Sequence, residues 1–137
     1  MYYLLALCCA IQILAAYKEM FTWEAFSDQV LGLPTLLDQR GVARDTRDDL
    51  IEMTGKLGLN QGLYNLFLAA GMIPGLIFGL DGGYGTLAVF SLLCMAVAGL
   101  FGAVTVPAPD GSNSNLRVFG AQAGAPIATL LAIWIGG

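Results

Sequence analysis

The chain has 137 residues, of which 57% are hydrophobic and only 12% are charged, and it contains no histidine. Soluble domains carry about 25% charged residues, so this composition argues against a water-soluble domain. The net charge of −4 argues against nucleic acid as a partner, because surfaces that bind nucleic acid are basic. The lack of histidine removes the commonest general base and a frequent metal ligand. We therefore expect no metal and no cofactor.

Four apolar segments make up most of the chain, at about 2–26, 57–80, 86–106 and 118–135. A helix of about 20 mostly apolar residues crosses a bilayer core of roughly 30 Å. The sequence therefore predicts an all-α fold, a four-helix transmembrane bundle with antiparallel neighbours, and a single integral membrane domain over 1–137. No basic residue precedes the first segment, so we expect a permanent helix and not a cleaved signal.

The basic residues all fall on one side of the predicted bundle. Between the first and second segments lie Lys18, Arg40, Arg44, Arg47 and Lys56, and Arg117 lies between the third and fourth. The other side has no basic residue. Because positively charged loops stay in the cytoplasm, we predict a multi-pass protein of the cell membrane, the inner membrane in a bacterium. Both termini are expected on the non-cytoplasmic side.

The connection between the first two segments is long and polar. Two glycines and a proline between residues 32 and 41 favour a loop. Thr46, followed three positions later by Asp49, is typical of a helix start, which predicts one short helix in this cytoplasmic loop that ends before Gly55. Carboxylates alternate with arginines there, a pattern that we interpret as a solvated helix face. The connection from 107 to 115 is predicted to be a polar turn.

Small residues recur at intervals of four in the second and fourth segments. The predicted helix-packing residues are Gly71, Gly75, Gly79, Gly120 and Gly124. Residues four apart share a helix face, and small side chains let helix backbones approach closely in lipid. We interpret both stripes as contacts between helices of one chain, with a homodimer face as the alternative.

Polar side chains gather near the predicted cytoplasmic ends of the helices, where burial in lipid is costly. The ligand-binding candidates are Glu19, Trp23, Asn60, Gln61, Tyr64, Asn65 and Gln122. Gln61 and Asn65 are four apart and are expected to face the same direction. We expect Glu19 and the four amides to converge in the cytoplasmic half of the bundle. They would either satisfy one another and lock the bundle, or line a small cavity with a few convergent polar groups.

Several of these residues lie in segments that resemble a known family. The segments are EMFTW at 19–23, NQGLYNLFLAAG at 60–71 and AGLFGAVT at 98–105, followed by Gln122 and Pro126. Together they resemble the small integral membrane proteins called domain of unknown function 1304. The resemblance covers nearly the whole chain, and it implies four membrane helices and an uncharacterised role. The segment 32–56 is longer than the usual connection in that family.

No signature of a known reaction occurs in the sequence, and no residue is assigned as catalytic. We expect a non-enzymatic protein that binds a lipophilic or amphipathic molecule, or an accessory subunit of a membrane complex. The alternatives are a small membrane enzyme that uses Glu19 as acid or base on a lipid-soluble substrate, and a small transporter working as an oligomer. Membrane lipid is the expected partner, with other membrane subunits or a homodimer as alternatives.

Overall fold

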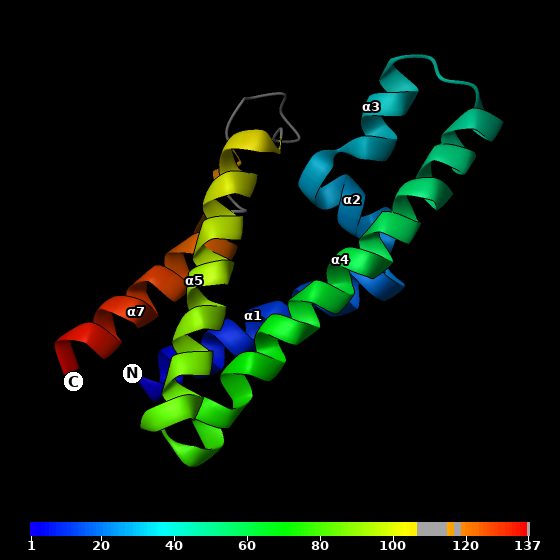
Figure 1. Ribbon diagram of the computed structural model, residues 1–137. Coiled ribbons are helices and arrows are strands. Elements are labelled where there is room, and N and C mark those ends of the chain that lie inside the picture. Colours follow the sequence, from blue (N-terminus) through cyan, green and yellow to red (C-terminus); the bar gives the residue numbers. More distant parts are fainter. Residues whose placement is uncertain (107–114, 117–118, 137) are drawn as a thin grey trace.

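The computed structural model describes residues 1–106, 115, 116 and 119–136, and within these ranges every regular element is a helix. The elements are α1 (Tyr2–Phe21), α2 (Trp23–Leu31), α3 (Leu33–Gln39), α4 (Arg44–Phe78), α5 (Gly82–Thr105), the π-helix η1 (Phe119–Gly124) and α7 (Ala125–Gly136) (Figure 1). The predicted all-α class is confirmed. The polar turn predicted before Asn115 and the basic residue Arg117 lie outside the described residues.

Three helices, α1, α4 and α5, are long and apolar enough to cross a membrane. The 20 residues of α1 give a length of about 30 Å, which matches the hydrocarbon core of a bilayer. The fourth predicted span, 118–135, corresponds to η1 and α7, whose apolar part is a shorter helix over Gln122–Gly136.

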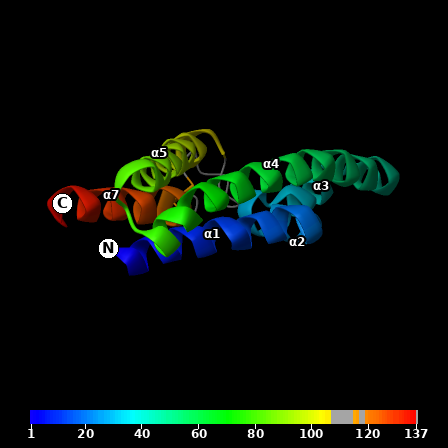
Figure 2. The same cartoon turned by 60° about the horizontal axis from the view of Figure 1, so that its bottom comes forward.

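The long helices pack side by side in chain order. α1 lies against α4, α4 against α5, and α5 against η1 and α7, while α7 returns to α1 (Figure 2). Gly62 of α4 contacts Met20 near the end of α1, and Gly79 lies near Tyr2 at its start, so these two helices are antiparallel. The start of α1, the end of α7 and the turn between α4 and α5 lie at one end of the molecule (Figure 1).

The core lies where α1, α4 and α5 meet. Its fully buried side chains include Leu5, Cys8, Met72, Leu92 and Met95. The outer faces of the long helices are apolar as well, and they leave many large hydrophobic side chains uncovered. Examples are Tyr3 at 91% exposed, Val104 at 71% and Trp134 at 81%. An apolar outer surface of this extent is suited to lipid, because soluble proteins rarely expose large contiguous apolar patches.

The first predicted span is too long, because α1 ends at Phe21 instead of continuing to Phe26. Thr22 leaves the helical conformation with φ −134° and ψ 38°. Both its backbone N–H and its hydroxyl donate to the carbonyl oxygen of Lys18, at 3.0 and 3.1 Å. These bonds close the last turn of α1, and the chain changes direction before α2 begins at Trp23.

The connection between α1 and α4 is helical, and the predicted loop with one short helix is wrong in detail. Gly32, with φ 60°, ends α2, and Pro34 occupies the first turn of α3, as expected of glycine after a helix and proline at a helix start. The short helix predicted after Thr46 is the first part of α4, which continues through Gly55. Gly55 lies within this helix, and the Trp23 side chain packs onto it.

Candidate functional site

Glu19 and Asn65 form a buried pair between α1 and α4. The Asn65 Nδ2 atom donates a 2.7 Å hydrogen bond to Oε2 of Glu19. Glu19 is 5% exposed and Asn65 is 3% exposed. The buried face of α1 contains Gln12, Ala16 and Glu19, whose spacing of four and three places them on one side of a helix. The antiparallel packing of α4 brings Asn65 opposite this face.

The other predicted polar residues of α4 do not join this pair. Asn60, Gln61 and Tyr64 are exposed, so the predicted convergence is wrong for Asn60 and Gln61. The reason is the buried line of α4 residues that packs against α2, α1 and α5, which includes Gly58, Gly62, Asn65, Ala69 and Met72. Their spacing alternates between four and three, as on a packed helix face. The position on this face before Asn65 is therefore Gly62, one residue beyond Gln61. Gln122 lies half-buried in η1.

Trp23 lies where α2 crosses α4. Its Nε1 atom donates to Oγ1 of Thr54 at 3.1 Å, and the Thr54 hydroxyl also lies 2.8 Å from the carbonyl oxygen of Leu50. A Cβ atom at Gly55 would lie 3.3 Å from the indole ring, and one at Gly58 would overlap it. The two glycines therefore make the space that the indole ring fills, and they fix α2 against α4.

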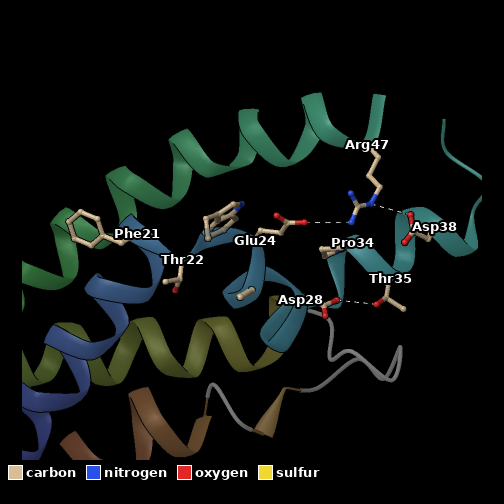
Figure 3. Close-up of a pocket in the computed structure, with 10 residues that line it drawn as sticks. Phe21, Thr22, Glu24, Asp28, Pro34, Thr35, Asp38 and Arg47 are labelled. Carbon is tan, nitrogen blue, oxygen red and sulfur yellow. Dashed lines mark hydrogen bonds and ion pairs between the residues drawn. The ribbon is translucent and has the colours of Figure 1, made fainter. Parts of the chain in front are cut away.

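Arg47 connects α2, α3 and α4 near the start of α4, at the end of the molecule away from the turn between α4 and α5 (Figure 1). From α4 its guanidinium group forms ion pairs with Glu24 of α2 at 3.6 Å, Asp38 of α3 at 3.1 Å and Asp48 at 2.9 Å. Figure 3 shows Arg47 extending from α4 toward Glu24 and Asp38. Single exposed ion pairs contribute little to stability, but this side chain is mostly buried and joins α2 and α3 to α4 through one group.

Asn115 holds the other end of α2. Its Nδ2 atom donates to the carbonyl oxygen of Val30 at 3.1 Å, and its backbone N–H donates to the carbonyl oxygen of Ala103 at 2.8 Å. The side chain is 1% exposed. Asn115 therefore ties the last turn of α2 to the last turn of α5, and α2 is held on both sides.

Two pockets lie beside Trp23, at the end of the bundle where α2 and α3 pack on α4. The larger has a volume of about 630 Å³ and is lined by Phe21, Thr22, Trp23, Glu24, Ala25, Asp28, Pro34, Thr35, Asp38 and Arg47 (Figure 3). The smaller, of about 400 Å³, is lined by Met20, Phe21, Trp23, Glu24, Ile51, Glu52, Gly55, Lys56 and Leu59. Of the sequence-predicted ligand candidates, Trp23 alone lines these two pockets.

The glycines of the two predicted stripes differ in their surroundings. Gly71 and Gly75 are buried and face α5, where a Cβ at Gly71 would overlap Ser91 and one at Gly75 would lie 3.0 Å from Ala88. Gly79 follows α4 with φ 93°, so its role is in the turn. A Cβ at Gly120 would have no neighbour within 4 Å among the described residues. Gly124 is half-buried in η1.

Gly99, outside both stripes, packs against the backbone of η1. A Cβ on Gly99 would lie 2.7 Å from the carbonyl oxygen of Gln122. Pro126 has no N–H, so it cannot donate to that carbonyl four residues earlier. The π-helix ends at Gly124, directly before this proline. The π-helix thus lies next to Gly99, whose lack of a side chain lets α5 approach it closely.

Arg47, Thr54 and Asn115 were not predicted from the sequence. Arg47 lies in an alternating run of charges, the usual pattern of a solvated helix face, and two of its partners, Glu24 and Asp38, come from α2 and α3, which the sequence did not predict as separate helices. Thr54 lies next to Gly55, with Gly58 three positions later. This pair of glycines in a polar helix is the one local signal that a large side chain packs there. Asn115 carries no local signal, because Val30 and Ala103, to which it donates, are distant in sequence.

Comparison with protein families gives one match over almost the whole chain. The family model of DUF1304, described as a protein of unknown function, matches residues 6–134. The chain belongs to the DUF1304 family. The match includes α1 from residue 6 onward, all of α2 to α5, and nearly all of α7. The suspected resemblance is confirmed.

No curated protein and no solved structure matches this DUF1304 chain.

Proposed function

We propose that this chain is an integral membrane protein, an antiparallel four-helix bundle that binds a small amphipathic molecule in the pockets beside Trp23. The binding is non-enzymatic in this proposal. The observation that supports it is the position of the pockets. They lie where an apolar bundle meets a polar cap, which we define as α2, α3 and the first part of α4 up to Lys56.

The length of α4 supports this placement. Its 35 residues make it roughly 50 Å long, well beyond the hydrocarbon thickness of about 30 Å. Near Gly62 it lies beside Met20, almost at the end of α1. The part of α4 before that level therefore extends beyond the end of α1, together with α2 and α3. All basic residues of the described chain except Lys18 lie in this cap or, for Arg40, in the connection between α3 and α4, which favours a cytoplasmic location for the cap.

The lining of the pockets fits an amphipathic ligand. Phe21 and Trp23 supply aromatic surface, and Glu24 and Arg47 supply charge. Ligand sites combine apolar walls with a few polar groups that orient the ligand. Phe21 is exposed on the outside of α1, so an apolar chain could enter from the surrounding lipid.

The geometry gives less support to an enzyme that uses Glu19 as acid or base. Glu19 is buried, accepts a hydrogen bond from Asn65 and lines neither pocket. A general acid or base must come within hydrogen-bond reach of its substrate. The pair is better explained as a lock between α1 and α4.

Phe21→Ala tests the proposal, because this exposed ring lines both pockets and its removal should not unfold the bundle. The wild-type protein is purified in mild detergent, and bound molecules are extracted and measured by mass spectrometry. We expect an amphipathic molecule in stoichiometric amount with wild type, and at least a fivefold loss with Phe21→Ala. Phe90→Ala is the matched control, since Phe90 is an exposed ring of α5 outside both pockets. Equal retention by all three proteins would contradict the proposal.

An accessory subunit of a membrane complex is the second candidate, and the exposed amides of α4 favour it. Asn60 and Gln61 are exposed near the level where α1 ends, and polar groups at a lipid-facing position are satisfied when another subunit contacts them. Under this alternative, Asn60→Leu with Gln61→Leu would release a co-purifying protein, and Phe21→Ala would leave it bound.

A further inference from the structure

The two pockets beside Trp23 share one boundary. Phe21, Trp23 and Glu24 line both of them, one of about 630 Å³ and the other of about 400 Å³. These three residues come from the end of α1 and the start of α2, where the helix is interrupted at Thr22. The indole of Trp23 is held by Thr54 and by the glycines of α4, so the boundary has a fixed position between the pockets. The two pockets are therefore neighbours that share these three residues.

The two pockets differ in chemistry. Beyond the shared boundary, the larger pocket adds two further carboxylates, from Asp28 and Asp38, together with the hydroxyl groups of Thr22 and Thr35. The smaller pocket adds the apolar side chains of Met20, Ile51 and Leu59, with Glu52 and Lys56 at its rim. Those two rim charges are paired with each other at 3.2 Å. The larger pocket is therefore suited to a polar head and the smaller one to an apolar chain.

The charges of the larger pocket select the sign of that head. Three carboxylates, from Glu24, Asp28 and Asp38, line it against the single guanidinium group of Arg47. Arg47 already forms ion pairs with Glu24 and Asp38 and with Asp48 outside the pocket. Asp28 accepts a 3.0 Å hydrogen bond from Thr35 (Figure 3), a neutral donor, and its carboxylate forms no ion pair with a basic residue in the described part of the chain.

We infer that the two pockets form one site for a single-chain amphiphile with a cationic amine head, which lies beside Asp28 while its chain lies against Met20, Ile51 and Leu59. This inference rests on the proposed function and names the class of its ligand. The aromatic rings of Phe21 and Trp23 support the assignment, because aromatic faces attract cations as carboxylates do. An anionic head would meet three carboxylates and an arginine that is already paired, so like charges would oppose its binding.

Fluorescence of Trp23 tests the inference directly. The protein has two tryptophans, so Trp134→Phe leaves Trp23 as the only one, and Trp134 lies in α7, away from both pockets. This variant is placed in phosphatidylcholine nanodiscs and titrated with dodecylamine, dodecanol or dodecanoate. We expect a saturable change in Trp23 emission with dodecylamine, and affinity at least tenfold lower for the other two compounds.

A charge-neutral variant then identifies the group that binds the head. Asp28→Asn keeps the oxygen that accepts from Thr35 and removes the charge, so it should preserve the fold and weaken dodecylamine binding roughly five- to tenfold. Asp49→Asn is the matched control, because it removes an exposed charge of the same cap outside both pockets. Affinity for dodecylamine should be unchanged in the control.

The outcomes separate the two proposals. Saturable binding of dodecanoate or dodecanol at least as tight as that of dodecylamine would overturn the cationic head and leave the proposed amphiphile site intact. Equal weakening by Asp28→Asn and Asp49→Asn would overturn the assignment of the head to Asp28. If none of the three compounds gave a saturable change in Trp23 emission, both the inference and the proposed function would be contradicted.

Discussion

The amide of Asn65 donates a 2.7 Å hydrogen bond to the carboxyl group of Glu19, and both side chains are buried between α1 and α4. The two residues are 46 positions apart in sequence. A buried carboxyl group without a partner would be strongly unfavourable, so this bond specifies how far α4 is shifted along α1. The pair fits the first of the two alternatives that the sequence left open, in which the polar groups satisfy one another and lock the bundle.

Replacing Asn65 should therefore destabilise the protein. In Asn65→Leu, Glu19 loses its donor while it stays buried, and we expect the free energy of unfolding to fall by roughly 1–3 kcal/mol. Unfolding in mild detergent, monitored by circular dichroism during titration with a denaturing detergent, measures the change. Asn60→Leu is the control, since Asn60 is exposed and its change should stay within about 0.5 kcal/mol. Equal effects of the two substitutions would show that the bond does not stabilise the bundle.

Replacing Gln12 should have the opposite effect on the free energy of unfolding. Its Oε1 atom is buried and has no hydrogen-bond partner among the described residues. A buried acceptor without a partner is unfavourable, and an apolar group of similar shape removes that penalty. We expect Gln12→Leu to keep or raise the free energy of unfolding, by up to about 1 kcal/mol, in the same unfolding experiment. A decrease as large as that of Asn65→Leu would show that Gln12 is hydrogen-bonded in the folded protein, for example to an internal water molecule.

Gly58 is expected to tolerate no side chain. A Cβ there would overlap the indole of Trp23, so Gly58→Ala should displace the ring and weaken the packing of α2 on α4 by roughly 1–3 kcal/mol. The emission of Trp23 in the Trp134→Phe background reports the displacement as a shift toward longer wavelength. Gly83→Ala is the matched control, because a Cβ at Gly83 meets no described atom within 4 Å. Identical emission spectra for the two variants would contradict this arrangement.

Gly99 is also expected to tolerate no side chain, because a Cβ there would meet backbone atoms of η1. Its Cβ would lie 2.7 Å from the carbonyl oxygen of Gln122, and a main-chain atom cannot move aside as a flexible side chain can. Gly99→Ala is expected to lower the thermal midpoint of unfolding in detergent by several degrees, corresponding to roughly 1–3 kcal/mol. Gly120→Ala, whose added Cβ meets no described atom within 4 Å, should leave the midpoint unchanged within about 1–2 degrees. A comparable loss in both variants would show that the effect is not specific to the contact between α5 and η1.

The orientation in the membrane can be tested with single cysteines in a cysteine-free background. From the distribution of basic residues, we expect Cys at position 83, in the turn after α4, to react with a membrane-impermeant maleimide added to intact cells. Cys at position 49, in the cap, should react only after the membrane is permeabilised. Labelling of position 49 in intact cells, with protection of position 83, would reverse the predicted topology.

Part of the candidate site could be predicted from the sequence. Burial of Glu19 and Asn65 follows from the high free energy of polar groups in lipid, which requires each to have a partner. The same reasoning failed for Asn60 and Gln61, because it does not say which side of α4 faces α1. That side is fixed by Gly58 and Gly62, where the absence of side chains lets Trp23 and Met20 pack closely.

The sequence by itself determined the helical class and the positions of the three long apolar helices. Their length and composition are local properties, and an apolar run of about 20 residues is stable in lipid only when its backbone is internally hydrogen-bonded. Only the tertiary structure decided that α2 and α3 are helices and that two pockets lie where they pack on α4. These short helices are marginal alone, since helices below about 12–15 residues depend on packing. The contacts of Trp23 with Thr54 and of Arg47 with Glu24 and Asp38 supply that packing.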